Sequence, residues 1–354
     1  MSETNNAAAF LQSATSAGAS DIFVVAGLPI SYKVNGVMHT EGERLMPNDT
    51  ELFIRNIYEL AGNRAIQHFL DTGDDDFSFA IPGLSRFRVS TYKQRGSLAA
   101  VIRIIAFELP HPDEIGIPPA VLSLTSMTKG LILVTGPAGS GKSTTLSCLV
   151  DQINSTRQDH IITLEDPLEF LHRHKKSIVS QREISTDTDN YLTALRAALR
   201  QSPDVILLGE MRDHETIQTA MTAAETGHLV LSSLHTIGAA STISRIIDVF
   251  DPSQQHQIAM QLSMVLRAVI SQQLVPSLQG GMIPAFEIMI MTPAISNMIR
   301  DNKTHQIEGI IYTSAKEDMI SMDNSLLQLY KAGRISAETA LQYCTNAEML
   351  RKKL

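Results

Sequence analysis

The stretch Leu131-Ile132-Leu133-Val134-Thr135-Gly136-Pro137-Ala138-Gly139-Ser140-Gly141-Lys142-Ser143-Thr144 decides the fold of this chain. It opens with a continuous apolar run, which predicts a strand that is buried on both faces. A glycine-rich loop follows, and the residues after it predict a helix. Glycines let the backbone wrap closely, so that successive N–H groups point at one anion. This order of strand, loop and helix predicts a phosphate-binding loop rather than an ordinary turn.

The polar groups of this loop match the parts of a nucleotide. Lys142 would supply a positive charge to the β- and γ-phosphates, and the Ser143 hydroxyl is placed to ligate Mg²⁺. The helix N-terminus adds a favourable dipole. We therefore expect ATP and Mg²⁺ as ligands, with the nucleotide held by Gly136, Ala138, Gly139, Ser140, Gly141, Lys142, Ser143 and Thr144.

Three more short apolar runs follow the loop, at residues 161–164, 205–208 and 229–231. Runs that are apolar on both faces and alternate with helices indicate a parallel sheet covered on two sides, so we expect an α/β fold. Most of the remaining chain is expected to be helical, including one long helix from Ser253 to Leu274, whose apolar residues lie near helical spacing.

Charged side chains follow these predicted strands. Glu165-Asp166-Pro167-Leu168-Glu169 ends the second strand, and Glu210 follows the third. Parallel sheets place ligands at the carboxyl ends of their strands, so we expect these carboxylates beside the phosphate loop, with Glu210 orienting Mg²⁺. His228 and His235 flank the fourth strand and suggest γ-phosphate sensing. Neither has a cysteine or a second histidine close by, so a separate metal site is not expected.

The residues before the loop predict a separate α+β domain. We expect helices at residues 3–18 and 49–71, a hairpin with an Asn35-Gly36 turn, an acidic turn at 74–76 and an antiparallel meander from 77 to 105. Four prolines between residues 107 and 119 disfavour regular structure and predict a linker. The expected organisation is an N-terminal domain at 1–106, a linker at 107–119 and an ATPase domain at 120–354.

Composition narrows the class of protein. The formal net charge is −8, and no aromatic-interleaved basic stretch is present, which disfavours a helicase or a constitutive DNA-binding protein. The two cysteines are far apart in sequence, which fits a reducing compartment. The N-terminus lacks the pattern of a signal peptide, and no apolar run reaches the length of a membrane span. We expect a cytoplasmic protein that reaches a membrane only through partners.

Several motifs together resemble one family, the secretion ATPases of the type II and type IV pilus group. Besides the phosphate loop, the resemblance rests on residues 165–170, 180–183, 194–200, 209–213 and 223–236 and covers nearly the whole chain. It implies a PAS-like N-terminal domain, a RecA-like ATPase core with helices after it, and a homohexameric ring. It also implies the roles of individual residues, which are Glu169 as general base, Glu210 as Walker B glutamate, Arg103 reaching phosphate from the N-terminal domain, and Arg245 near the subunit boundary.

Two further features resemble the pilus retraction branch of this family. The chain is short, without a long N-terminal extension or a four-cysteine zinc element, and residues 294–300 resemble the retraction signature Ala-Ile-Arg-Asn-Leu-Ile-Arg. Ser296 stands where that signature has arginine, and Ala138 stands where the phosphate loop usually has threonine. The resemblance implies a motor for pilin depolymerisation and twitching motility, acting on a platform protein at the inner face of the cytoplasmic membrane. Alternatives are a secretion or DNA-uptake ATPase, an accessory pilus motor, or a regulator that binds ATP but barely hydrolyses it.

Overall fold

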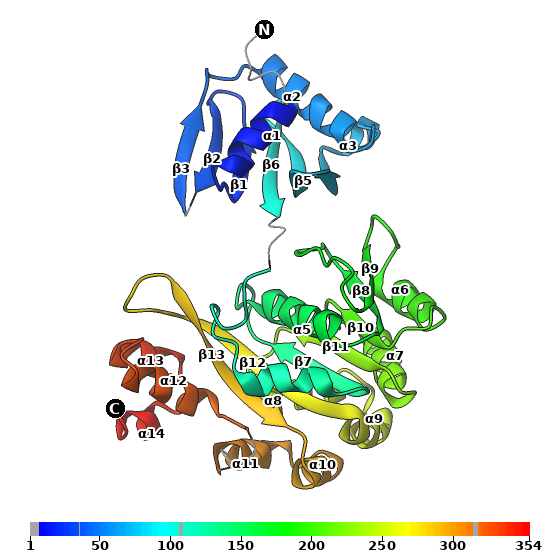
Figure 1. Ribbon diagram of the computed structural model, residues 1–354, viewed down its shortest axis with the longest axis vertical. Coiled ribbons are helices and arrows are strands. Elements are labelled where there is room, and N and C mark those ends of the chain that lie inside the picture. Colours follow the sequence, from blue (N-terminus) through cyan, green and yellow to red (C-terminus); the bar gives the residue numbers. More distant parts are fainter. Residues whose placement is uncertain (1–6, 35, 106–108, 314–317) are drawn as a thin grey trace. The chain divides into compact units, whose positions relative to one another are not determined.

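A computed structural model describes residues 7–34, 36–105, 109–313 and 318–354 (Figure 1). The chain divides into two compact units, Met1–Glu108 and Leu109–Leu354. Parts of three expected features lie outside the described residues, namely the start of the first helix, Asn35 in the hairpin turn and the first residues of the linker. In the described part of the chain, no helix combines the length and the apolarity that spanning a bilayer requires.

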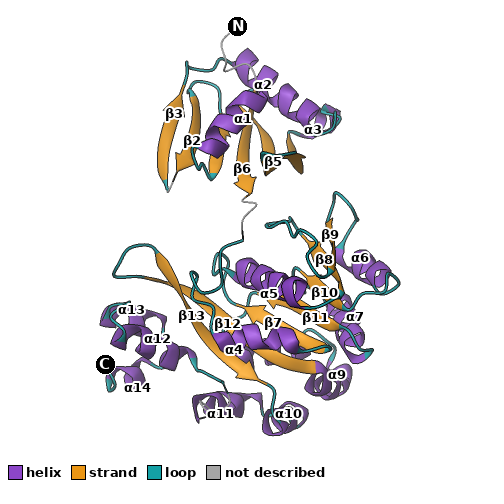
Figure 2. Ribbon diagram, viewed as in Figure 1, coloured by secondary structure: helices purple, strands orange, loops and turns teal. Residues whose placement is uncertain are grey.

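The first unit is an antiparallel sheet with helices packed on it (Figure 2). The strand order is β3-β2-β1-β6-β5-β4. Its core joins Phe10 of the first helix and Phe53 of the second to Ile22, Phe87 and Ile102 of the sheet. The elements are α1 (Ala7–Ser16), β1 (Asp21–Val24), β2 (Ile30–Val34), β3 (Val37–Glu41), α2 (Pro47–Leu60), α3 (Gln67–Thr72), β4 (Asp74–Ile81), β5 (Ser85–Gln94) and β6 (Ser97–Ile105).

Two expectations for this unit were wrong. The helix predicted at residues 49–71 is two helices, because Gly62 and Asn63 adopt left-handed backbone angles, with φ of 75° and 57°, between α2 and α3. The predicted acidic turn is the start of strand β4, because Gly73, with φ of 96°, makes the turn one residue earlier. The acidic stretch keeps this strand conformation while Asp75 accepts hydrogen bonds from Tyr58 and Arg64.

The second unit is a mixed sheet of order β13-β12-β7-β11-β10-β8-β9, in which all neighbours are parallel except β12 and β13. Alternating residues of β7 enter two different cores. Leu131 and Leu133 pack with helices α6 to α9, and Ile132 and Val134 pack with α4 and α5. The expected α/β fold with a sheet covered on both faces is thereby confirmed. The strands are β7 (Gly130–Thr135), β8 (His160–Glu165), β9 (Ile178–Glu183), β10 (Val205–Leu208), β11 (Leu229–Leu234), β12 (Leu266–Pro276) and β13 (Met282–Ile290).

Helices fill the connections and the C-terminal part of the unit. A small core around Leu326 and Ala340 joins the last helices to Val275 of β12 and Ala285 of β13. The helices are α4 (Pro119–Ser123), η2 (Leu124–Ser126), α5 (Lys142–Thr156), α6 (Tyr191–Ala198), α7 (His214–Glu225), α8 (Ala239–Asp248), α9 (Pro252–Val265), α10 (Pro293–Arg300), η3 (Thr304–Gln306), α11 (Ile307–Thr313), α12 (Met322–Lys331), α13 (Ala337–Tyr343) and α14 (Ala347–Arg351).

The long helix predicted from Ser253 to Leu274 was wrong in its second half. Helix α9 ends at Val265, and β12 begins at Leu266 and runs between β7 and β13. Strand β12 is covered on both faces, so Ala268, Val269 and Ile270 are all buried. Because its apolar residues are consecutive, they also fit the spacing of a helical stripe, which explains the wrong prediction. The linker stretch also differs from its expectation, because residues 109–118 belong to the second unit, where Ile117 is buried in its core.

Candidate nucleotide site at the carboxyl edge of the parallel sheet

The phosphate loop connects β7 to α5 and needs its glycines for two reasons. Gly136, Gly139 and Gly141 all have positive φ, at 142°, 74° and 87°. In addition, a Cβ atom on Gly136 would lie 2.1 Å from the backbone oxygen of Gln272, and one on Gly141 would lie 2.8 Å from its side-chain nitrogen. Strand β12 therefore supports the loop directly from behind.

Gln272 is part of this site and was not predicted. Its side-chain oxygen accepts a hydrogen bond from the Thr145 hydroxyl at 2.7 Å, which ties β12 to the first turn of α5. Only 4% of the residue is exposed. The expected long helix placed this residue on a helix, so no contact with the phosphate loop could be inferred from it.

Lys142 lies across the loop from which it comes. Its ammonium donates hydrogen bonds to the backbone oxygens of Gly136 and Pro137, both at 2.9 Å. Burial lowers the pKa of Lys142, while the carboxylates of Glu210 and Glu169 act in the opposite direction. A buried ammonium with negative groups nearby is well suited to meet phosphate oxygens.

The predicted acidic residues converge beside Lys142. They line a cavity of about 290 Å³ that the residues after β7, β8, β10 and β11 enclose. Topology explains this, since the carboxyl ends of neighbouring parallel strands meet at one edge. The predicted residues in its lining are Ala138, Gly139, Lys142, Ser143, Glu165, Glu169, Glu210 and His235.

Glu210 is held between two basic side chains. Arg212 approaches one carboxylate oxygen at 2.5 Å, and Nε2 of His235 lies 3.4 Å from the other. The Glu210 side chain is 12% exposed, whereas those of Arg212 and His235 are largely exposed. No role was predicted for Arg212, and only the structure distinguishes it as a partner of Glu210. If Glu210 moves or binds another group, its contacts with both Arg212 and His235 would change.

Glu165 is the most buried carboxylate of the cavity, with 7% of the residue exposed. Burial raises its pKa from 4.5 to about 7, and the negative charges of Glu169 and Glu183 add to the effect. The neighbouring polar side chains of Thr163 and Gln181 act in the opposite direction. Keeping Glu165 ionised therefore costs the folded protein free energy, which is typical of a residue kept for function rather than stability.

Glu165→Gln should therefore stabilise the nucleotide-free protein in a pH-dependent way. The folded-state pKa lies above the unfolded one, so raising the pH through this interval weakens wild-type folding, by an amount on the order of 3 kcal/mol at most. We expect the variant to gain about 1–3 kcal/mol at pH 8 and less than about 1 kcal/mol at pH 5. Urea unfolding at the two pH values measures this. An equal gain at both would show that repacking, rather than ionisation, is responsible.

The residues present fit a magnesium ion. The Ser143 hydroxyl and the carboxylates of Glu165, Glu169 and Glu210 line one cavity, and Mg²⁺ prefers such oxygen ligands. Across the described ranges, no group of three histidine, cysteine or acidic side chains is arranged as a ready-made metal site.

His228 does not lie in this cavity. It precedes β11, so it belongs to the amino edge of the sheet, opposite the edge that carries the phosphate loop. Its Nδ1 lies 2.9 Å from the Ala223 oxygen near the end of α7. Grouping His228 with the nucleotide-binding residues of its own chain is therefore not supported by its position, and the contact indicates a structural role.

Six other predicted residues do not line the cavity, namely Gly136, Ser140, Gly141, Thr144, Arg103 and Arg245. Arg245 on α8 lines a neighbouring cavity of about 340 Å³, which shares Glu210, Arg212 and His235 with the first. Thr144 lines a third cavity, of about 410 Å³, on the other side of the phosphate loop. Arg103 belongs to the first unit, where it pairs with Asp21 at 3.0 Å.

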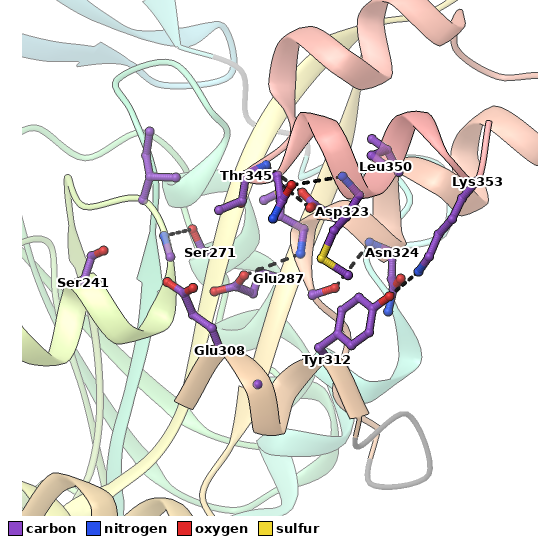
Figure 3. A pocket seen from close by; sticks show the side chains of 17 residues that line it. Ser241, Ser271, Glu287, Glu308, Tyr312, Asp323, Asn324, Thr345, Leu350 and Lys353 are labelled. Carbon is purple, nitrogen blue, oxygen red and sulfur yellow. Dashed lines mark hydrogen bonds between the residues drawn. The ribbon is translucent and has the colours of Figure 1, made fainter. Parts of the chain in front are cut away.

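Two further features of the second unit lie away from the phosphate cavity. Ser296 lies on α10, and its hydroxyl donates a hydrogen bond to the Ser263 oxygen of α9 at 3.0 Å. A cavity of about 370 Å³ near the C-terminal helices contains none of the predicted residues (Figure 3). Its buried carboxylate, Glu287, accepts a hydrogen bond from the Ala239 amide at 2.8 Å and so caps helix α8.

Comparison with known proteins identifies the family. A family model described as type II/IV secretion system protein matches residues 4–282. The type IV pilus retraction ATPase PilT of Pseudomonas aeruginosa is 44% identical over 323 residues, which cover 91% of this chain and 93% of that protein. The type IV pilus ATPase PilU of the same organism is 37% identical over 336 residues, covering 94% and 87%. A crystal structure of the pilus retraction motor PilT with bound ADP is 44% identical, with a TM-score of 0.90 and coverage of 97% and 98%. The chain therefore belongs to the family of type II/IV secretion system proteins.

Proposed function

We propose that this chain is the ATPase subunit of a motor that retracts type IV pili. The observation that carries the proposal is the single cavity in which the phosphate-loop Lys142 faces Glu169 and Glu210. The similarity to a pilus retraction ATPase over 91% of the chain, and to a retraction motor solved with ADP, supports it. Phosphoryl transfer needs mainly positioning and charge neutralisation, which these residues can supply.

The residues of the cavity take separate roles in hydrolysis. Glu169 accepts a proton from the attacking water, whose oxygen forms a bond to the γ-phosphorus while the bond to the bridging oxygen breaks and ADP leaves. Lys142 and the loop N–H groups stabilise the charge on the phosphates. Ser143 and Glu210 would hold Mg²⁺, which would supply positive charge toward the phosphates. His235 lies against Glu210, so it can sense the state of that carboxylate.

The nucleoside has a separate place on the other side of the loop. The cavity of about 410 Å³ begins at Gly141 and Thr144 and extends to residues 113–117, Pro284 and Arg334. Its lining combines apolar side chains such as Ile117 and Leu274 with polar ones such as Asp113 and Arg334, a mixture that suits a purine base and its ribose. The triphosphate would then pass over Gly141 into the acidic cavity.

The proposed assembly is a homohexamer. Arg103 and Arg245 would reach nucleotide phosphates or a subunit boundary in that ring, in the manner of arginine fingers. The ring would act on a platform protein and lie against the inner face of the cytoplasmic membrane. Assembly would then be a condition for full turnover.

An accessory pilus motor is the second candidate. Two observations favour an accessory pilus motor over a secretion role. The chain is 37% identical to the pilus ATPase PilU, and Ser296 replaces an arginine of the retraction signature. Serine lacks the positive charge of the arginine, and its hydroxyl is bonded within the chain. The site chemistry is the same for both candidates, so piliation separates them.

The test is deletion of the gene in its own host, complemented with the wild-type chain or with Lys142→Ala. A main retraction motor predicts hyperpiliated, non-twitching cells that only the wild-type chain restores. Bald cells would contradict retraction and indicate pilus extension. Normal piliation with weakened twitching would favour the accessory motor, and unchanged pili with lost secretion or DNA uptake would favour a secretion ATPase.

A further inference from the structure

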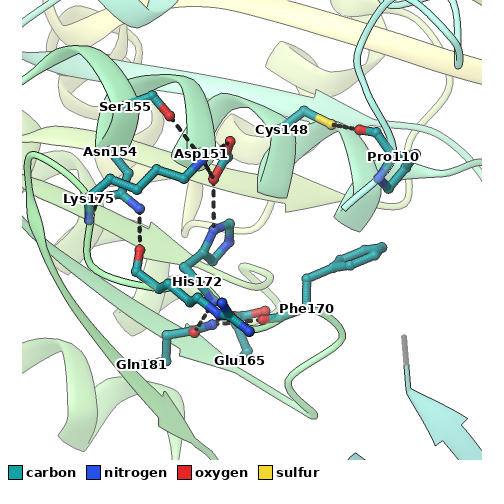
Figure 4. Close-up of polar contacts among 11 residues, drawn as sticks. Pro110, Cys148, Asp151, Asn154, Ser155, Glu165, Phe170, His172, Lys175 and Gln181 are labelled. Atoms are coloured by element: carbon teal, nitrogen blue, oxygen red, sulfur yellow. Dashed lines mark hydrogen bonds and ion pairs between the residues drawn. The ribbon is translucent and has the colours of Figure 1, made fainter. Parts of the chain in front are cut away.

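The loop between β8 and β9 carries Glu169 and is held by side chains of β9. Gln181 forms three contacts with this region (Figure 4). Its side-chain nitrogen donates to the Phe170 oxygen at 2.9 Å and to the Glu165 carboxylate at 3.4 Å. Its side-chain oxygen accepts a hydrogen bond from the His172 amide at 2.7 Å. The Gln181 side-chain amide thus contacts both Glu165 and the backbone just after Glu169.

The backbone just before Glu169 is held in the same way. Glu183, two residues further along β9, accepts a hydrogen bond from the Leu168 amide at 3.2 Å. Residues two apart on a strand face the same side, so Gln181 and Glu183 act on one loop together. Glu169 itself is exposed and lines the phosphate cavity between these two fixed neighbours. Its carboxylate is therefore positioned through its backbone.

The far end of the loop is tied to the helix that starts at the phosphate loop. Asn154 of α5 donates to the Arg173 oxygen at 2.7 Å and accepts from the Lys175 amide at 3.1 Å. Lys175 also pairs with Asp151 at 2.8 Å. The loop is consequently fixed to α5 at one end and to β9 near Glu169. Among these anchors, Gln181 also contacts Glu165, a carboxylate of the phosphate cavity.

We propose that Gln181 is a positioning residue for hydrolysis, which places Glu169 and orients Glu165 without touching the nucleotide. The inference rests on the proposed ATPase function. At position 181 the side chain must donate to the Phe170 oxygen and Glu165 and must accept from the His172 amide. A side-chain amide can do both. Glutamate would keep the acceptor for His172 but face the Phe170 oxygen and Glu165 with a negative group. Methionine has similar length but offers neither strong donor nor strong acceptor.

The experiment measures ATP turnover and ADP binding of the full chain for Gln181→Met and Gln181→Glu, with the exposed Gln257→Met of α9 as matched control. We expect kcat to fall about 10–100-fold in both Gln181 variants, since a misplaced base costs about this much. KM for ATP and Kd for ADP should stay within about twofold, because the phosphate loop is untouched. Unchanged kcat in Gln181→Met, or a matching loss of ADP binding, would overturn the proposal.

A double-variant cycle separates positioning from a loss of general stability. If Gln181 acts through Glu169, adding Gln181→Met to Glu169→Gln should lower turnover by less than about twofold. A further tenfold loss in the double variant would show that Gln181 acts elsewhere and would contradict the inference. Wild-type protein without any Mg-ATP turnover in its assembled state would instead refute the proposed function, so the two failures are distinguishable.

Discussion

Lys142→Ala should lower kcat/KM for ATP by about 10²–10³-fold or more. The ammonium is buried, lies over the loop and faces Glu169 and Glu210 across the cavity. Its loss removes the point charge that phosphates would meet, while the loop N–H groups remain. Phosphate release from the assembled protein, measured over a range of ATP concentrations, gives both kcat and KM.

The fold should survive this substitution. Burial lowers the pKa of Lys142, so its charged form is costly in the folded state, and alanine relieves that cost while it leaves a small cavity. We expect unfolding free energies of the variant and wild type to agree within about 1–2 kcal/mol. Lys129→Ala, at an exposed position, is the matched control and should hydrolyse ATP normally. Normal hydrolysis in Lys142→Ala would contradict a phosphate role for the loop.

Most of the parallel sheet could be predicted because its strands carry two signals at once. The four continuous apolar runs predict strands, and the glycine-rich loop after the first fixes which edge is functional. The same signal failed for β12. Its apolar residues are consecutive on a strand buried on both faces, so Val265, Leu266, Val269 and Ile270 fit a helical stripe equally well. Because of that error, Gln272 could not be placed behind the phosphate loop.

The candidate site contains residues that strand topology predicts and residues that it does not. Residues at the end of a strand or just after it, such as Glu165 and Glu210, could be placed together from topology alone, and the structure does bring them together. His228 shows the limit of that reasoning, because a residue that precedes a parallel strand belongs to the opposite edge. Arg212 and Gln181 depend on side-chain contacts between separate segments, and no spacing in the sequence encodes those.

Glu169→Gln should lower kcat by about 10²–10⁴-fold and leave KM for ATP and Kd for ADP within about twofold. The amide keeps the size of the side chain but cannot accept a proton from water. Glu169 is exposed within the cavity, and its neighbours are fixed by β9, so the substitution should not disturb the loop. Single-turnover phosphate release at saturating Mg-ATP measures the chemical step.

Comparison with Glu210→Gln identifies which carboxylate is the base. Glu210 is the proposed magnesium partner and is bound to Arg212 and His235, so its variant should raise the Mg²⁺ concentration needed for half-maximal turnover. Glu169→Gln should leave that requirement unchanged, since a base acts on water rather than on the ion. The exposed Glu348→Gln of α14 serves as the matched control. If Glu169→Gln instead raised the Mg²⁺ requirement while Glu210→Gln lowered only kcat, the two roles would be exchanged. In that case the β9 contacts around Glu169 would position a metal ligand rather than a base.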